Sequence, residues 1–177
     1  MINERAGSPK LVRDLMTVGV CTCPPETPVL DIARIVIERD IEAIVVLDAE
    51  EGHALGVISQ DELVEASTRS QVNALKAEDI MKDGVIKVLP DIPITAAAQL
   101  MKDNKVRVLF LMHHSGGVEY PAAMISYKHI LRHLAARNRD ELRDLGVNAE
   151  RRSPIQVFIE RRDAARKRVH HIKNKET

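Results

Sequence analysis

The chain contains the same sequence pattern twice, and this repeat constrains its fold more than any other feature. Identical residues recur at a constant offset of 65 positions over the first half of the pattern. The offset becomes 67 at Ser59 and Ser126, so the second copy carries about two additional residues. A register held over so many positions indicates two copies of one structural unit. The pairs at offset 65 are Asp14 and Asp79, Met16 and Met81, Val20 and Val85, Pro25 and Pro90, Pro28 and Pro93, and Ala33 and Ala98.

Size and composition predict that the two copies fold together. The chain has 177 residues, and each copy of about sixty residues would bury too little surface to be stable alone. We therefore expect one module in which the copies pack against each other. Apolar residues make up 45% of the chain but aromatic residues only 2%, so the core must consist of aliphatic side chains and methionine.

Several classes of protein are disfavoured by composition. No run of eighteen apolar residues is present, which argues against a membrane-spanning helix. The N-terminus lacks the apolar centre of a signal peptide. The two cysteines, Cys21 and Cys23, do not form a secreted disulfide framework. We expect a cytoplasmic protein.

Each copy has the pattern strand, helix, strand, strand, helix. Thr27 followed by Pro28 is typical of a capped helix start. Continuous apolar runs predict strands buried on both faces. In the first copy the expected elements are a strand at 20–23, a helix at 28–40, strands at 44–47 and 55–58, and a helix at 60–66. In the second they are a strand at 85–88, a helix at 93–103, strands at 108–112 and 122–125 joined by a polar loop at 113–119, and a helix at 127–137.

These patterns predict the domain organisation. Residues 1–10 form a flexible lead-in, residues 11–67 and 77–137 the two units, and residues 68–76 a linker. Residues 138–177 form a helical basic extension, in which Ser153 and Pro154 start a helix that runs to about residue 172. Between residues 150 and 177 there are nine Lys or Arg against four Asp or Glu, although the whole chain has no net charge.

The junction at Ser59 is the most informative candidate site. A buried strand ends there and a helix begins, and the first amides of a helix carry partial positive charge without an internal partner. The Ser59 hydroxyl can receive a phosphate together with these amides, or it can simply cap the helix. Glu62, one turn later, can accept the hydroxyls of a ribose, as acidic residues do in dinucleotide folds.

The ordered set of paired motifs resembles the CBS domain, the cystathionine β-synthase motif, which usually occurs in tandem as a Bateman module. The resemblance covers about two thirds of the chain and excludes the basic extension. It implies an α/β fold of two pseudo-symmetric β-α-β-β-α units packed sheet to sheet. The residues that carry it are Asp14, Leu15, Met16, Thr22, Pro25, 41–47 and 56–59 in the first copy, and Asp79, Ile80, Met81, Lys87, Pro90, 106–112 and 123–126 in the second.

The resemblance also implies two clefts between the units, which in this family often bind AMP, ADP, ATP or S-adenosylmethionine. It implies that two modules associate into a flat disc, here a homodimer. In the first copy Gly56, Ser59 and Glu62 match the ligand motif, with Glu62 in place of Asp, and Thr22 matches a position near the base or ribose. We expect this first cleft to hold an AMP-like ligand.

The second copy departs further from the family pattern. Ser126 is retained, but His129 replaces the acidic residue and Ala123 replaces the glycine. Lys87 replaces the threonine of the first copy, and Arg107 is assigned to the same cleft edge. We expect the second cleft to be more basic, and either to prefer a polyphosphate or to be closed.

No catalytic set is found: the chain lacks a nucleophile elbow, a P-loop and a persuasive Cys/His pair. His129 and His133 share a helix face, but no further zinc ligands accompany them. The sequence therefore predicts a regulatory sensor with neither its own catalysis nor a metal, acting on a separate effector protein. One alternative is a ligand-free dimerisation scaffold. Another is association with nucleic acid through the basic extension, which lacks a groove-reading motif.

Overall fold

The computed structural model describes residues 10–48, 52–115 and 117–136. The lead-in before residue 10 and the basic extension with its expected helix at 154–172 lie outside the described residues. The nucleic-acid hypothesis therefore rests on the sequence alone. Among the described residues no helix is both long and apolar enough to cross a membrane.

The first copy folds in the order that its pattern predicts. It contains β2 (Thr22–Cys23), α2 (Val29–Glu38), β3 (Ala43–Leu47), β4 (Ala54–Ser59) and α3 (Gln60–Ser67). Strand β3 pairs in parallel with β2 and antiparallel with β4. One detail differs, because Thr27 does not cap α2. Its hydroxyl donates to the carbonyl oxygen of Pro24 at 2.8 Å, and the helix begins after Pro28 without a side-chain cap.

The second copy contains α5 (Ile94–Asp103), β6 (Val108–Ser115), β7 (Val118–Ser126) and α6 (Tyr127–Ala135). The polar loop expected at 113–119 is wrong, since both strands continue into it. Cross-strand pairs sustain the longer hairpin, including an edge-on ring contact between His113 and Tyr120 with centroids 5.4 Å apart. The strand expected at 85–88 is also absent, and only a single bridge joins Lys87 to Phe110.

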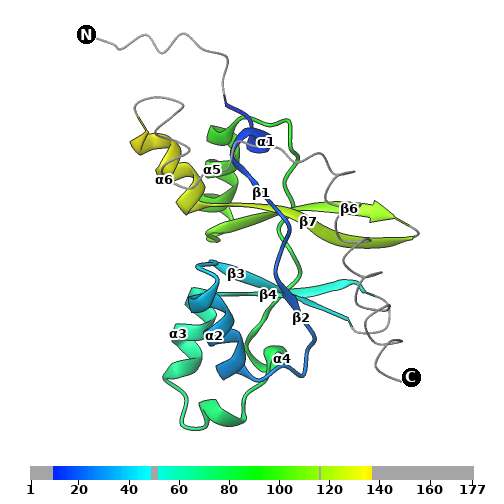
Figure 1. Cartoon of the computed structure of the whole chain (residues 1–177), viewed down its shortest axis with the longest axis vertical. Coiled ribbons are helices and arrows are strands. Elements are labelled where there is room, and N and C mark those ends of the chain that lie inside the picture. The colour runs from blue at the N-terminus through cyan, green and yellow to red at the C-terminus, as the bar shows by residue number, and fades with distance from the viewer. Residues whose placement is uncertain (1–9, 49–51, 116, 137–177) are drawn as a thin grey trace, which may run out of the picture. The chain divides into compact units, whose positions relative to one another are not determined.

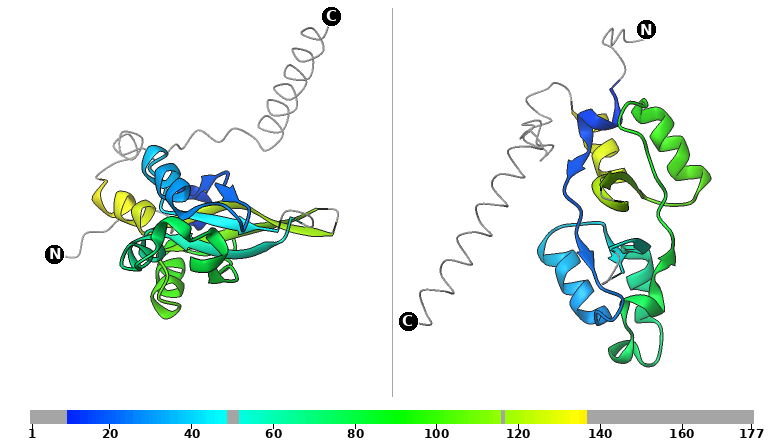
Figure 2. Two further views of the ribbon diagram at one scale, coloured as in Figure 1. Left: turned by 90° about the horizontal axis from the view of Figure 1, so that it is seen from below. Right: turned by 90° about the vertical axis from the view of Figure 1, so that its right-hand side faces the viewer.

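The first strand of each copy joins the sheet of the other copy, which the sequence did not indicate. Strand β1 (Thr17–Val18) pairs with β7, and β5 (Lys82–Asp83) pairs with β4. The described sheets therefore have the orders β1-β7-β6 and β2-β3-β4-β5. The short helices α1 (Val12–Leu15) and α4 (Ala77–Ile80) precede these strands, and the 3₁₀ turn η1 (Val72–Ala74) lies in the linker. Figure 2 shows the two connecting segments, blue and green, running between the halves.

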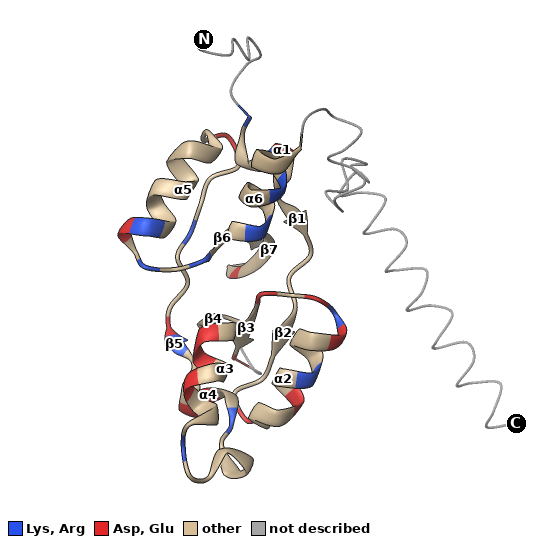
Figure 3. Cartoon of the chain, turned by 90° about the vertical axis from the view of Figure 1, so that its left-hand side faces the viewer, with Lys and Arg blue, Asp and Glu red and all other residues tan. Residues whose placement is uncertain are grey.

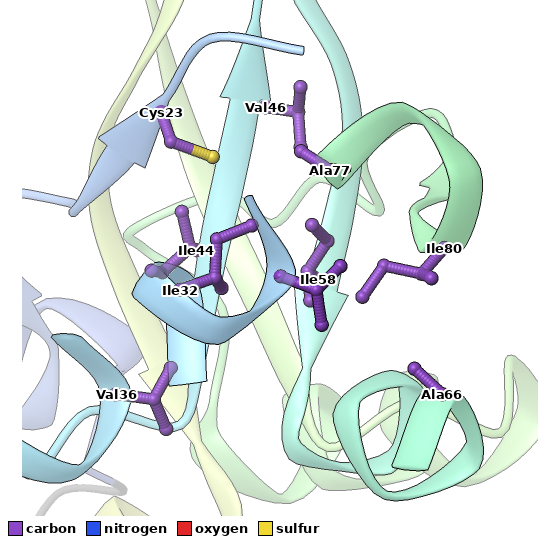
Figure 4. Packing of buried hydrophobic residues seen from close by; sticks show 10 residues of the cluster. Cys23, Ile32, Val36, Ile44, Val46, Ile58, Ala66, Ala77 and Ile80 are labelled. Atoms are coloured by element: carbon purple, nitrogen blue, oxygen red, sulfur yellow. The ribbon is translucent and has the colours of Figure 1, made fainter. Parts of the chain in front are cut away.

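The two sheets face each other, as expected, with the helices of each copy on the outer sides (Figure 1). Ala43 and Val45 of β3 are fully buried in one cluster with Val108, Phe110 and Met124. Each copy also has its own aliphatic core between its helices and its sheet, and Figure 4 shows Ile32, Ile44 and Ile58 meeting in the first copy. Apolar packing between the sheets makes one module of two units that are individually too small.

Candidate functional site

A cavity of ≈ 210 Å³ lies between the two copies beside the Ser59 junction. The first copy supplies Val57, Ser59, Asp61 and Glu62 from the end of β4 and the start of α3. The second copy supplies residues 82–84 and Ile86, residues 104–107 between α5 and β6, and Val108 and Phe110 of β6. Ser59, Glu62 and Arg107 are therefore the sequence-derived site residues that line it.

Glu62 is fixed by the start of α3. Its Oε2 atom accepts the backbone N–H of Ser59 at 2.8 Å and also the Ser59 hydroxyl. The Ser59 oxygen in turn accepts the N–H of Asp61 at 3.2 Å, and Ser59 and Glu62 together form a capping box. The remaining oxygen, Oε1, lies 2.6 Å from Nζ of Lys82, the first residue of β5. Only 6% of the Glu62 side chain is exposed, so this carboxylate is both buried and engaged.

The protonation of Glu62 follows from these contacts. Burial raises the pKa of Glu62, but the hydrogen bonds from Lys82 and Ser59 together outweigh it, so the pKa lies below its ordinary value. The same contact raises the pKa of Lys82, although partial burial of the ammonium opposes this rise. Both groups are therefore charged at neutral pH. Lys82 is 63% exposed, so it can leave Glu62 more readily than Glu62 can move.

A second ion pair crosses the cavity lining. Nη2 of Arg107 lies 3.0 Å from Oδ1 of Asp61, with side chains 59% and 49% exposed. Arg107 belongs to the second copy and Asp61 to the first, so this pair joins the copies (acidic α3 is visible in Figure 3). Beside it, Lys105 has a left-handed backbone with φ of 54°, which is uncommon for a residue with a side chain.

Gly56 acts through packing. A Cβ atom there would lie 2.5 Å from the carbonyl oxygen of Lys82 and 3.0 Å from the sulfur of Met81. Gly56 does not line the cavity, but its lack of a side chain lets β5 approach β4 and place Lys82 beside Glu62.

The equivalent junction in the second copy is built differently. The Ser126 N–H donates to Nδ1 of His129 at 3.1 Å, and the Ser126 hydroxyl lies 2.8 Å from the same atom. Because a backbone N–H can only donate, Nδ1 carries no proton, and the neutral ring holds its proton on Nε2. Nε2 lies 2.7 Å from the Thr17 hydroxyl of β1. Burial, with Arg132 and Lys128 nearby, lowers the pKa of His129 to about 4.

The polarity of the cross-copy ion pair is reversed at this second junction. Lys128 on α6 pairs with Asp40 of the first copy, whereas at the first junction the helix supplies the anion, Asp61, and the other copy the cation. At the repeat offset of 65, Glu42 in the first copy is the equivalent of Arg107 in the second copy. The sequence assigned Arg107 to the second cleft, but the structure places it at the first.

The remaining sequence-derived residues lie elsewhere. Lys87 is 2.6 Å from Glu119 on β7, which lowers the pKa of that carboxyl. Thr22 is exposed on β2 and does not line the cavity. Conversely, Lys82 and Asp61 were missed, although the repeat already aligned Lys82 with Thr17. Among the described residues, no three His, Cys, Asp or Glu side chains are grouped to hold a metal.

Comparison with known proteins gives one family. The family model of the CBS domain matches residues 12–69 and 77–136. A CBS domain pair solved with 5′-methylthioadenosine and S-adenosyl-L-methionine is 20% identical with a TM-score of 0.63, covering 73% of this chain and 99% of that one. A CBS-domain protein from Agrobacterium tumefaciens is 20% identical with a TM-score of 0.61, covering 75% and 98%. A CBS domain protein from Pyrobaculum aerophilum, complexed with AMP, is 17% identical with a TM-score of 0.59, covering 77% and 98%. No match is found among curated proteins.

Proposed function

Since the chain belongs to the CBS domain family, we propose that it is a non-catalytic regulatory module that binds an adenosine nucleotide in the cavity at Ser59. One observation carries the proposal: both copies line this cavity, and together they offer a helix start, three cations and an apolar wall. Two structures of similar fold hold adenosine compounds, one AMP and the other S-adenosylmethionine with 5′-methylthioadenosine.

The cavity lining suits the three parts of a nucleotide. Val57, Ile86 and Val106 provide apolar surface for a base. Lys82, Lys105 and Arg107 provide positive charge for phosphate. When Lys82 turns toward a phosphate, Oε1 of Glu62 becomes free to accept ribose hydroxyls. The cavity is smaller than the roughly 300–1,000 Å³ of typical ligand sites, so binding requires the exposed side chains to move apart.

Regulation would follow from linkage. A ligand that contacts both copies favours the arrangement of the copies in which both sets of contacts are made. A partner that distinguishes this arrangement senses the ligand, and by reciprocity alters ligand affinity to the same degree. We propose that the effector is a separate protein.

A thermal-shift panel of AMP, ADP, ATP, S-adenosylmethionine, NAD and cyclic dinucleotides tests the proposal. A ligand at a hundred times its dissociation constant adds about 2.7 kcal/mol of apparent stability. We expect Glu62→Gln to diminish the ligand-induced shift. The matched control is Glu65→Gln, one turn further along α3 and outside the cavity lining. An unchanged shift in Glu62→Gln would show that Glu62 does not bind the ligand. The absence of a shift with every compound would contradict the proposed ligand binding.

Exposed apolar side chains favour the alternative of a dimerisation scaffold. On α6, Leu131 and Leu134 are 61% and 70% exposed, and Ile37 on α2 is 79% exposed. Leu131 and Leu134 are three residues apart and share one face of α6, and contiguous exposed apolar surface marks interaction sites. We propose that the chain is a homodimer whether or not it binds a ligand. Light scattering of Leu131→Glu tests this, with exposed Ala96→Glu on α5 as the control for added charge.

A further inference from the structure

We infer that the Asp61 carboxylate occupies the phosphate position of the cavity, so that a ligand binds by replacing Asp61 on Arg107. This inference rests on the proposed function and narrows its ligand class. A nucleotide with a free phosphate can make the exchange, whereas a neutral nucleoside cannot.

The position of Arg107 supports the exchange. Its carbonyl oxygen accepts the N–H of Tyr127 at 2.9 Å, which ties the Arg107 backbone to the second copy. Its guanidinium extends into the cavity lining and meets the first copy at Asp61. A guanidinium binds carboxylate and phosphate with the same planar fork of donors, so the two anions are direct competitors.

Asp61 is also the carboxylate that can most easily leave. The cap of α3 uses its backbone N–H and the side chains of Ser59 and Glu62, so the Asp61 side chain is not part of it. An ion pair of half-exposed groups contributes about 0–1 kcal/mol. By contrast, Glu62 is buried and held through both oxygens. The two neighbouring carboxylates therefore have different roles, with Glu62 fixed and Asp61 exchangeable.

The balance of charge explains why Asp61 matters for the ligand. Lys82, Lys105 and Arg107 face Asp61, Glu62 and Asp83, so the lining carries no net charge. A phosphate that enters this cavity is repelled by Asp61 until the phosphate replaces Asp61 as the partner of Arg107. Asp61 should therefore lower the affinity for anionic ligands and leave neutral ones unaffected.

The second junction cannot make the same exchange. Its helix start carries Lys128 in place of Asp61, and Glu42 stands at the position of Arg107. The phosphate position is therefore a property of the first junction, where Arg107 and Asp61 meet.

The test is isothermal titration of the full chain with AMP, adenosine and tripolyphosphate. The variants are Asp61→Asn, Arg107→Gln and the control Asp31→Asn. Asp31 also lies in the first turn of a helix and pairs with an arginine, Arg34, at 3.0 Å, but outside the cavity. We expect Asp61→Asn to bind AMP and tripolyphosphate about two- to fivefold more tightly, the range that loss of an exposed ion pair allows. Adenosine affinity should stay unchanged, and Arg107→Gln should reduce the difference between AMP and adenosine, because only Lys82 and Lys105 then remain to bind the phosphate.

The outcomes separate this inference from the proposed function. Weaker or unchanged AMP binding by Asp61→Asn would overturn the exchange while the nucleotide function stands. Tighter tripolyphosphate binding without binding of any nucleotide would support the exchange and overturn the nucleotide function. Equal tightening by Asp31→Asn would overturn the exchange, since the effect would then be general charge. Failure of both wild type and Asp61→Asn to bind any of the three compounds would overturn both.

Discussion

Nε2 of His129 lies 2.7 Å from the hydroxyl of Thr17, and this contact ties the last described helix to the first described strand. It corresponds to the contact of Glu62 with Lys82 at the other junction. At both junctions a buried side chain, Glu62 or His129, caps the start of a helix and also contacts the first strand of the other copy, β5 or β1. The two links differ in charge, so they should respond differently to pH.

Acid should weaken the module through His129. Its folded pKa of about 4 lies below the unfolded value near 6.5, so the unfolded chain binds the proton more readily. The stability that the neutral ring contributes is therefore present above pH 6.5 and is lost as pH falls toward 4. We expect urea denaturation to show a loss of about 2 kcal/mol between pH 7.5 and 5.

Two variants show whether that loss comes from this ring. His129→Gln retains a group that can accept the cap bond but does not titrate, so most of the loss between pH 7.5 and 5 should disappear. His113→Gln changes an exposed ring on β6 and should retain it. A pH dependence that persists in His129→Gln would assign it to other groups. The lowered pKa of Glu62 acts in a lower range, since its contribution is lost only as pH falls below about 4.5.

Gly56→Ala should separate β5 from β4. The added methyl would lie 2.5 Å from a backbone oxygen that cannot turn away, so the strands must shift. Such overpacking costs about 1–3 kcal/mol, and the shift should also weaken nucleotide binding because Lys82 moves with β5. Gly117→Ala is the comparison, since a Cβ there meets no atom within 4 Å, only its φ of +84° opposes it, and Gly117 lies outside the cavity lining. If Gly117→Ala weakened nucleotide binding as much as Gly56→Ala did, close packing at Gly56 would not be what positions Lys82.

Lys105→Gly should stabilise the fold and weaken the site. Glycine adopts the left-handed backbone of this position without strain, and relief of the strain exceeds the added chain entropy by about 0.5–1 kcal/mol. The same change removes a cation from the cavity lining, so ATP affinity should fall. Asp40→Gly is the matched variant, because Asp40 has φ of 49° at the equivalent position but also pairs with Lys128. Chemical denaturation in which Lys105→Gly is less stable than wild type would contradict the strain argument.

The repeat and the apolar periodicity were sufficient to predict most of the framework. Helices α2, α3, α5 and α6 and strands β3, β4, β6 and β7 all overlap expected segments, and the regular apolar pattern is clearest in α2 and β3, which bury several aliphatic residues each. The pairing of β1 and β5 with the sheet of the other copy was not predictable in this way. Strands β1 and β5 have two exposed residues each, so they carry no periodic pattern, and their partners are distant in sequence.

The candidate site, too, was predicted only where local sequence patterns mark its residues. Ser59 and Glu62 were found because a strand-to-helix junction is a local pattern. Their neighbour Arg107 was assigned to the second cleft. No local sequence pattern shows that its side chain contacts the first copy. Lys82 was missed, since its role depends on β5 pairing with β4. Pairing between distant segments is therefore what the sequence analysis lacked.

The two junctions should be interchangeable as units but not as single residues. Lys82→Thr alone leaves the buried Glu62 without its cation, which we expect to cost about 1–3 kcal/mol. Glu62→His alone places an imidazole against an ammonium and should also destabilise the chain. The double variant rebuilds at the first junction the hydroxyl and ring that Thr17 and His129 form at the second. A double-mutant cycle measured by urea denaturation should therefore give a favourable coupling of at least about 1 kcal/mol. If the losses of stability in the two single variants simply add in the double variant, Thr and His do not form at the first junction the contact that they form at the second. The double variant should also lose affinity for nucleotides, because its cavity has neither the Lys82 ammonium nor the Glu62 carboxylate.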